Sequence, residues 1–174
     1  MRPPDLLNTS EEELKAWTVA QDPSAVRQTL EEIWQQIRNG HLYAGQPRSE
    51  ESERSVSLAK ACLQIAAYSG NDRLLIQSFR MLAYSLTANE QYQESLPYYE
   101  TCVSGLEAMG EPGQAARARL GFIAALFHVG RYQQALAVAA VAEDWFRKNN
   151  DEVGLARLCN NVANLYDRDR KSVV

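Results

Sequence analysis

The sequence repeats itself at a spacing of 40 residues from about residue 50 onwards, as in the step from Tyr92 to Tyr132. Self-similarity at a fixed period indicates the architecture of a chain more strongly than any single short motif does. The aligned pairs are Tyr92 with Tyr132, Ser95 with Ala135, Cys102 with Ala142, Leu106 with Phe146 and, one step earlier, Cys62 with Cys102 and Gly70 with Gly110. One such unit cannot bury its apolar face alone, so neighbouring units must stack. The spacing therefore predicts two complete units and two half units.

Within each unit the apolar residues recur at three- and four-residue steps, which is the period of an amphipathic helix. In the first helices they are Leu75, Phe79, Leu82, Ala83 and Leu86, then Ala118, Phe122, Ile123, Leu126 and Val129, then Leu155, Cys159, Val162, Ala163 and Tyr166. In the second helices they are Tyr92, Leu96, Tyr99, Cys102, Val103, Leu106 and Met109, then Tyr132, Leu136, Ala139, Ala142 and Phe146. Because strand signals are absent, we predict an all-α chain of stacked helix hairpins.

Glycine, asparagine and proline mark the breaks between these helices, at residues 89–90, 110–113, 130 and 149–151. Pro97 conflicts with a helix that begins near Tyr92, because a proline beyond the first turn removes a backbone hydrogen bond. A bend, or a later start of that helix, is expected there.

Two further helices are predicted before residue 50. Ser10 and Glu13 have the spacing of a capping box, which opens a helix that ends near residue 21. The apolar side of this helix consists of Leu14, Trp17 and Val19. Asp22 and Pro23 then begin a helix that Gly40 ends, and residues 41–49 are predicted to form a loop. The apolar stripe of this second helix is Val26, Leu30, Ile33, Trp34 and Ile37.

The composition excludes several classes of protein. The chain has 174 residues, of which 18 are basic and 22 acidic, so its net charge of -4 does not supply the basic field of a nucleic-acid-binding protein. Three cysteines, Cys62, Cys102 and Cys159, lie in apolar helical patterns and are expected to be reduced core thiols. No signal peptide and no apolar run long enough to span a membrane is present. We therefore expect a cytoplasmic protein.

Residues 50–168 resemble the tetratricopeptide repeat family, in a variety with a period near 40 residues. The strongest pieces are residues 130–136 (GRYQQAL) and 161–166 (NVANLY), which look like an inter-helix turn and a first helix. Glu90, Ile123 and Glu143 depart from the family pattern. The resemblance implies an α-α superhelix that binds a peptide or a partner protein, and residues 23–69 are expected to add a further hairpin with a long inserted loop.

By this resemblance, the concave groove of the array is lined by residues of the first helices, most of which are polar. They are Gln77, Arg80, Tyr84, Thr87, Arg117, Leu120, Ala124, Phe127, His128, Arg157, Asn160, Asn161 and Asn164. Asparagine amides can bond the N–H and C=O groups of an extended peptide, and arginines select carboxylates. An acidic or C-terminal segment is the expected ligand. At each single position, a polar helix face that meets only solvent remains the alternative.

The sequence is divided into an N-terminal capping helix (1–22), a helical repeat array (23–168) and a tail (169–174). The tail looks like the translation of a sequencing adapter, and the helix that begins at Glu152 matches the first member of a hairpin. We therefore expect an N-terminal fragment of a bacterial protein, which could self-associate through its unpaired last helix. The N-terminal helix either caps the first hairpin or occupies the groove as a self-ligand.

Two other functions stay open beside that of a binding scaffold with no cofactor and no metal. The array could be the sensory or regulatory arm of a multidomain transcription regulator or protease whose effector domain follows. It could also be a serine hydrolase that uses Ser57 and Lys60, which have serine-x-x-lysine spacing, although the companion motifs of such enzymes are absent. His41 and His128 have no metal-ligand spacing with the cysteines or acids, and both are expected to be polar surface residues.

Overall fold

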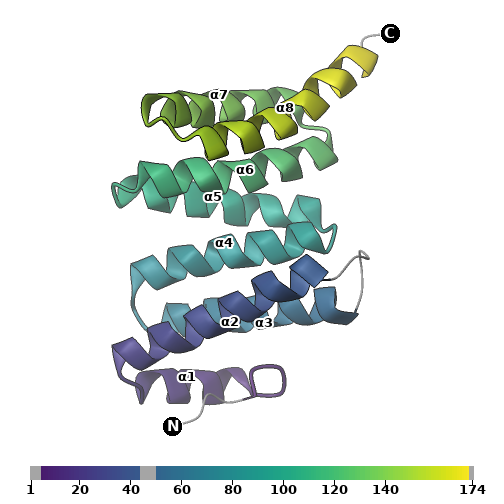
Figure 1. Cartoon of the computed structure of the whole chain (residues 1–174). Helices are drawn as coiled ribbons and strands as arrows, with labels where there is room; N and C mark the ends of the chain where they lie inside the picture. The colour runs from purple at the N-terminus through teal and green to yellow at the C-terminus, as the bar shows by residue number, and fades with distance from the viewer. Residues whose placement is uncertain (1–4, 44–49, 173–174) are drawn as a thin grey trace. The chain divides into compact units, whose positions relative to one another are not determined.

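The structure is a computed structural model that describes residues 5–43 and 50–172, with the side chains of residues 40–43, 51 and 164–172 left out of the description. The predicted all-α class is confirmed, because the described residues form eight helices and no strand (Figure 1). The helices are α1 (Glu11–Val19), α2 (Pro23–Tyr43), α3 (Glu50–Tyr68), α4 (Asp72–Ala88), α5 (Tyr92–Ala108), α6 (Pro112–Val129), α7 (Tyr132–Lys148) and α8 (Glu152–Ser172). None of them, within these described ranges, is long and apolar enough to cross a membrane.

The chain divides into two compact units, residues 1–91 and 92–174. In the first unit α3 packs against α1, α2 and α4, and α2 also contacts α4. In the second unit α6 packs against α5, α7 and α8, and α7 also contacts α8. The boundary between Gln91 and Tyr92 falls inside one of the hairpins that the 40-residue spacing predicts.

A common turn ends four successive helices. The residues with positive φ are Gly70, Glu90, Gly110, Gly130 and Asn150, which are spaced 20 residues apart. After four of them, the next backbone N–H donates to the carbonyl oxygen five residues earlier, from Gln91 to Leu86, Glu111 to Leu106, Arg131 to Leu126 and Asp151 to Phe146, at 2.8 to 3.0 Å. This is the Schellman closure of a helix, which needs a left-handed residue after the last helical turn. The breaks predicted at these positions are confirmed.

Glu90 occupies one of these left-handed positions, with φ of 59°, although a Cβ atom disfavours that conformation. Replacing Glu90 by glycine is expected to raise the free energy of unfolding by about 0.5 to 1 kcal/mol, because the relieved strain exceeds the added entropy of the unfolded chain. Urea unfolding followed by circular dichroism measures the change. Exposed Gln93→Gly, within helix α5, is the matched control and should destabilise instead. Equal destabilisation by both changes would contradict this account.

The predicted starts of α1 and α2 are confirmed, but the predicted end of α2 is not. The capping box of α1 is confirmed, with the Ser10 hydroxyl accepting from the Glu13 backbone N–H and Glu13 accepting from Ser10 N–H. The predicted stop at Gly40 is wrong, because α2 continues to Tyr43. Of the two alternatives expected at Pro97, a bend or a later helix start, the later start does not occur, because α5 begins at Tyr92 and includes the proline. Pro97 and Gln93 are both exposed, so water can bond the carbonyl that the proline leaves without a donor.

The predicted core is confirmed for α2, whose five stripe residues are all buried, and for most of α5 and α6. Val19, Met109, Cys159 and Ala163 are exposed, so their assignments to the core are wrong. Val19 is 70% exposed, because Thr18 takes the buried place on α1 and bonds the Leu14 carbonyl at 2.7 Å. Leu136 is half-buried, and Cys159 is exposed because α8 buries Gly154 and Leu158 in its place. The other thiols are in the core, and burial raises the pKa of Cys62 to about 12.

Candidate binding groove

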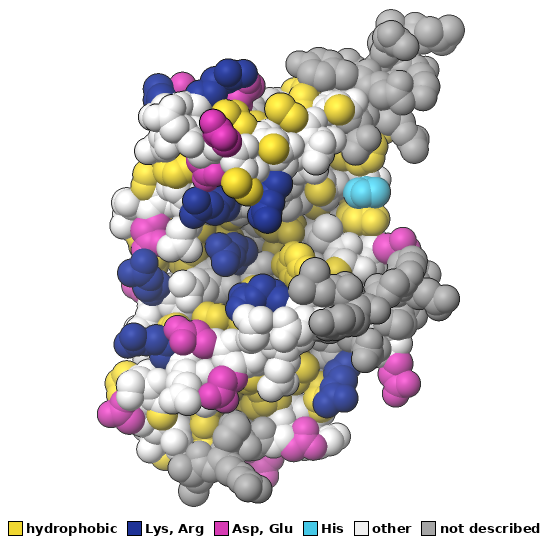
Figure 2. All heavy atoms as spheres, in the orientation of Figure 1, with side chains coloured by type: hydrophobic (Ala, Val, Ile, Leu, Met, Phe, Trp, Pro, Cys, Tyr) yellow, Lys and Arg dark blue, Asp and Glu magenta, His cyan; other side chains and the backbone are white. Residues whose placement is uncertain are grey.

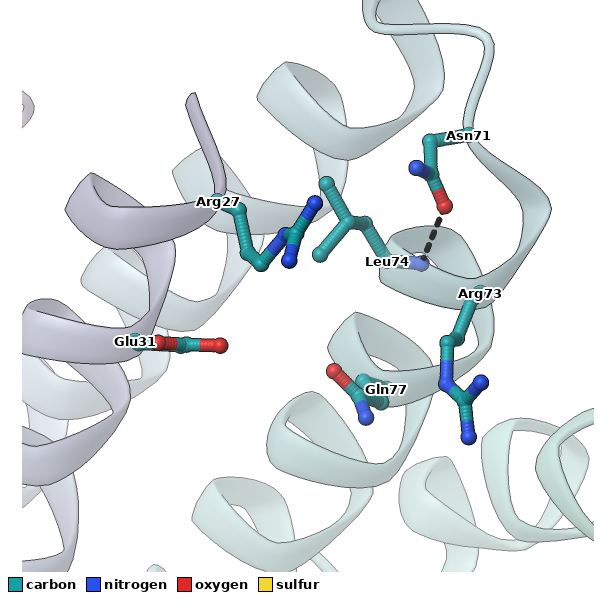
Figure 3. A pocket seen from close by; sticks show the side chains of 6 residues that line it. All are labelled: Arg27, Glu31, Asn71, Arg73, Leu74 and Gln77. Atoms are coloured by element: carbon teal, nitrogen blue, oxygen red, sulfur yellow. Dashed lines mark hydrogen bonds between the residues drawn. The ribbon is translucent and has the colours of Figure 1, made fainter. Parts of the chain in front are cut away.

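A groove lies between α2 and α4 in the first unit, where the two helices contact each other. It consists of two adjoining cavities of about 390 and 180 Å³, which share Glu31 and Gln77. The larger cavity is lined by Arg27, Glu31, Asn71, Arg73, Leu74 and Gln77 (Figure 3). The smaller cavity is lined by Glu31, Trp34, Arg38, Gln77, Arg80 and Met81. We call these two cavities together the α2–α4 groove.

Helical periodicity explains why these side chains share one groove. On α2 the lining residues Arg27, Glu31, Trp34 and Arg38 follow at steps of four, three and four. The apolar stripe of α2, including Leu30 and Ile37, packs into the core on a neighbouring face. The lining residues of α4 recur with the same period through Leu74, Gln77 and Arg80 or Met81. Each helix therefore presents one row of polar and apolar residues to the groove.

The groove is predominantly basic. Its lining contains four arginines and a single carboxylate, that of Glu31. Figure 2 shows basic side chains gathered over α2 and α4, with acidic ones between them. In the described part of the chain, Arg27, Glu31 and Arg80 form no ion pair, and Arg38 donates to the Gln35 side-chain oxygen at 2.8 Å. These charges are therefore available to a bound molecule.

Asn71, Trp34 and Tyr84 complete the surroundings of the groove. The Asn71 side chain is committed to the fold, because its oxygen accepts from the Leu74 backbone N–H at 3.1 Å as the N-cap of α4. Trp34 is only 5% exposed, and its indole N–H has no acceptor among the described residues. Tyr84 lies on α4 one turn beyond Arg80 and is exposed. Burial of part of its ring raises the pKa of Tyr84, and the charge of Arg38 partly offsets that rise.

Thr87 is half-buried on α4, and the other predicted lining residues belong to the second unit, on α6 and α8, which contact each other. Two of them already bond their own chain. Arg117 pairs with Asp151 at 3.0 Å, and the Asn161 amide donates to the Leu120 backbone carbonyl at 2.9 Å. Arg157 and Asn160 are exposed, and the Asn164 side chain lies outside the described residues. Some polar groups of this face are therefore already hydrogen-bonded within the chain.

Aromatic rings occupy the C-terminal end of α6. The His128 ring stacks on Tyr92 of α5, with centroids 4.1 Å apart and planes 6° apart. Phe127 is half-buried and meets His128 edge-on and Tyr132 at a tilt. These contacts join α5, α6 and α7 within the second unit, so Phe127 and His128 support packing as well as lining the surface.

Asp151 connects the two helices of this face. Its carboxylate accepts from the Gly154 backbone N–H at 2.9 Å and from Arg117, and these bonds hold the pKa of Asp151 below its usual value of 3.8. A carboxyl group whose pKa is lower in the folded state stabilises the fold above its unfolded pKa and loses this contribution as the pH falls through the folded value.

Asp151→Asn should therefore have a lower free energy of unfolding than the parent chain at pH 6. This difference in the free energy of unfolding should shrink towards pH 3. Asparagine keeps the capping oxygen but loses the charge. Urea unfolding at both pH values measures the difference, and Asp144→Asn, at an exposed site on α7, is the matched control. If Asp151→Asn lowers the free energy of unfolding equally at both pH values, the stabilising role assigned to the Asp151 charge is contradicted.

The sequence indicated only part of the α2–α4 groove. It assigned Gln77 and Arg80 to the lining, and both line the groove. It missed Arg73 and the α2 residues Arg27, Glu31, Trp34 and Arg38. A signal for α2 was present, because its charged residues repeat at helical steps beside the apolar stripe. α2 begins at Pro23 and α4 at Asp72, which are 49 residues apart instead of 40, so no aligned position pointed to them.

The other described candidate residues that the sequence suggested do not line the groove. The Ser57 hydroxyl donates to the Glu53 backbone carbonyl at 3.1 Å, and within the described ranges no hydrogen bond joins it to Lys60. The described residues include no group of three or more possible metal ligands, and His41 lies outside the described side chains. α1 packs on α3, where the Tyr68 hydroxyl donates to Glu11 at 2.5 Å, and no α1 residue lines either cavity of the groove.

Comparison with known proteins gives no family for this chain: no family model, no curated protein and no solved structure matches it.

Proposed function

We propose that this protein is an interaction module of the tetratricopeptide type, which binds an extended segment of a partner protein in the α2–α4 groove. The observation that carries the proposal is the pair of adjoining cavities with a charged lining, in which Arg27, Glu31 and Arg80 form no ion pair with any other described residue. Repeated helix hairpins are a frequent scaffold for such grooves, because stacking makes a rigid surface whose lining residues are free to vary.

The character of the groove favours a peptide over a small molecule. Pockets for small molecules are mostly apolar and enclose their ligand. The α2–α4 groove instead presents guanidinium, carboxylate and amide groups, with Leu74, Met81 and Trp34 as its apolar lining. Several turns of two helices contribute to it. An extended polypeptide, which offers charged side chains and backbone hydrogen-bonding groups along its length, matches such a lining.

Selection of peptides from a random displayed library, with the full chain immobilised, tests the proposal. Selected peptides should bind Arg80→Glu about tenfold more weakly than the parent, because the change turns attraction into repulsion inside the groove. Arg54→Glu, an equal change of charge at an exposed site on α3, should leave binding within about twofold. Failure to recover any binding peptide, or equal losses in the two variants, would overturn the proposal.

A further inference from the structure

We propose that the α2–α4 groove selects a segment by the order of its charges: a carboxylate, then a basic side chain, then a second carboxylate. This inference rests on the proposed function and specifies the chemistry of the partner. It follows from how the charges alternate along the groove, because a uniformly basic surface would accept any acidic segment.

The charges form three levels along the groove. At one end Arg27 of α2 lines the larger cavity beside Leu74, while the guanidinium group of Arg73 of α4 lies beyond Gln77 as seen from Glu31 (Figure 3). At the other end Arg38 and Arg80 line the smaller cavity. Glu31 and Gln77 line both cavities, so Glu31 lies between Arg27 at one end and Arg38 and Arg80 at the other. Figure 3 shows Glu31 on α2 facing across the groove towards Gln77 of α4.

Each level favours a different side chain. The guanidinium groups at the two ends can donate bidentate hydrogen bonds to a carboxylate. Glu31 has no ion-pair partner in the described structure, so it attracts a cation and repels a third carboxylate. The Gln77 amide is neutral and can either donate or accept. Repulsion at the middle level excludes uniformly acidic segments, and such unfavourable contacts are a general source of specificity.

The rise of a helix sets the spacing of the preferred side chains. Glu31 is four residues from Arg27 and seven from Arg38, which gives steps of about 6 and 10 Å at 1.5 Å per residue. An extended peptide advances about 3.3 Å per residue, so these steps correspond to about two and three residues. The preferred pattern is acid-x-base-x-x-acid in one chain direction, or acid-x-x-base-x-acid in the other. Because the two steps differ in length, the pattern that binds more tightly shows in which direction the segment lies along the groove.

Binding of short labelled peptides to the full chain, measured by fluorescence anisotropy at low salt, tests the inference. The probes are Glu-Ala-Lys-Ala-Ala-Glu and Glu-Ala-Ala-Lys-Ala-Glu, each with Gly-Ser flanks. A permuted peptide of the same composition, Lys-Ala-Glu-Ala-Ala-Glu, and an all-acidic peptide, Glu-Ala-Glu-Ala-Ala-Glu, serve as controls. One of the two patterned probes should bind at least about fivefold more tightly than either control.

Exchange of the middle charge provides the second test. Glu31→Lys should reverse the preference, so that the all-acidic peptide binds more tightly than the patterned probe by about fivefold. Glu32→Lys, an equal change of charge at the neighbouring exposed position on α2, should keep the preference of the parent. Because Glu31 is exposed, neither change is expected to disturb folding.

The outcomes separate this inference from the function on which it rests. Peptides that bind without regard to charge order, or a Glu31→Lys variant that keeps the parent's preference, would overturn the charge order and leave the binding function standing. Binding that no groove substitution alters, Arg80→Glu included, would overturn both.

Discussion

Replacing Phe146 by alanine is expected to lower the free energy of unfolding by about 3 to 5 kcal/mol, because the ring is fully buried and its removal leaves a cavity. The Phe146 side chain is 0% exposed on α7. It packs closely on Gly154 of α8, where a Cβ atom would lie 2.9 Å from the ring carbon Cγ. Its backbone carbonyl also accepts the bond that closes the turn after α7. Urea unfolding followed by circular dichroism measures the loss.

Val141→Ala on the same helix is the matched control for this measurement. Val141 is 51% exposed, so the change should alter the free energy of unfolding by at most about 0.5 kcal/mol. A Phe146→Ala effect no larger than that of the control would show that α7 and α8 are not held together by this contact.

Gly121→Val is expected to destabilise the chain by about 1 to 3 kcal/mol, because valine overfills the contact between α5 and α6. Gly121 faces the ring of Tyr99, which is 3% exposed and so has little room to move. A Cβ atom at position 121 would lie 2.8 Å from the ring carbon Cζ and close to the hydroxyl oxygen. Urea unfolding of the purified variant gives the magnitude.

Two further variants identify the cause of the Gly121→Val loss. Ala140→Val places the same side chain at an exposed helical position on α7 and should cost about 0.5 kcal/mol or less. In a Tyr99→Leu background the added cost of Gly121→Val should fall, because the two positions share one space. An undiminished cost in that background would assign the effect to something other than the Tyr99 ring.

The regular part of the fold was accessible from the sequence because local signals determine it. Glycine and asparagine at the helix ends supplied left-handed residues at 70, 110, 130 and 150, and the turns formed at those positions. Glu90 adopts the same conformation without a favourable side chain, which shows that the repeat holds this turn even where its residue is unfavourable. The period of the apolar residues likewise located α4 to α7.

The buried side of α8 was harder to predict because several of its faces are apolar. Leu155, Leu158, Cys159 and Val162 offer overlapping stripes, and the 40-residue alignment favoured the one that includes Cys159. In the structure, the close fit of Gly154 to the Phe146 ring sets the rotation of α8, and Leu158 becomes the buried residue. A glycine contact of this kind has no periodic signature in the sequence.

The α2–α4 groove depends on which helices become neighbours, and this limited its prediction. The resemblance to a repeat family pointed to α4 and so to Gln77 and Arg80. It did not extend to α2, whose register is shifted, and so it missed the Glu31 carboxylate that interrupts the basic lining. A charged residue on a helix surface is usually only solvated. Its role in the groove becomes apparent only when the facing helix is known.

The most direct test of the central claim is a nuclear magnetic resonance titration of the isotope-labelled chain with the tighter-binding patterned peptide. We expect the backbone amide signals of residues 27–38 and 71–81 to shift together and saturate, because these segments of α2 and α4 line the groove. Shifts confined to other helices, or no saturable shift at any peptide concentration, would contradict the central claim.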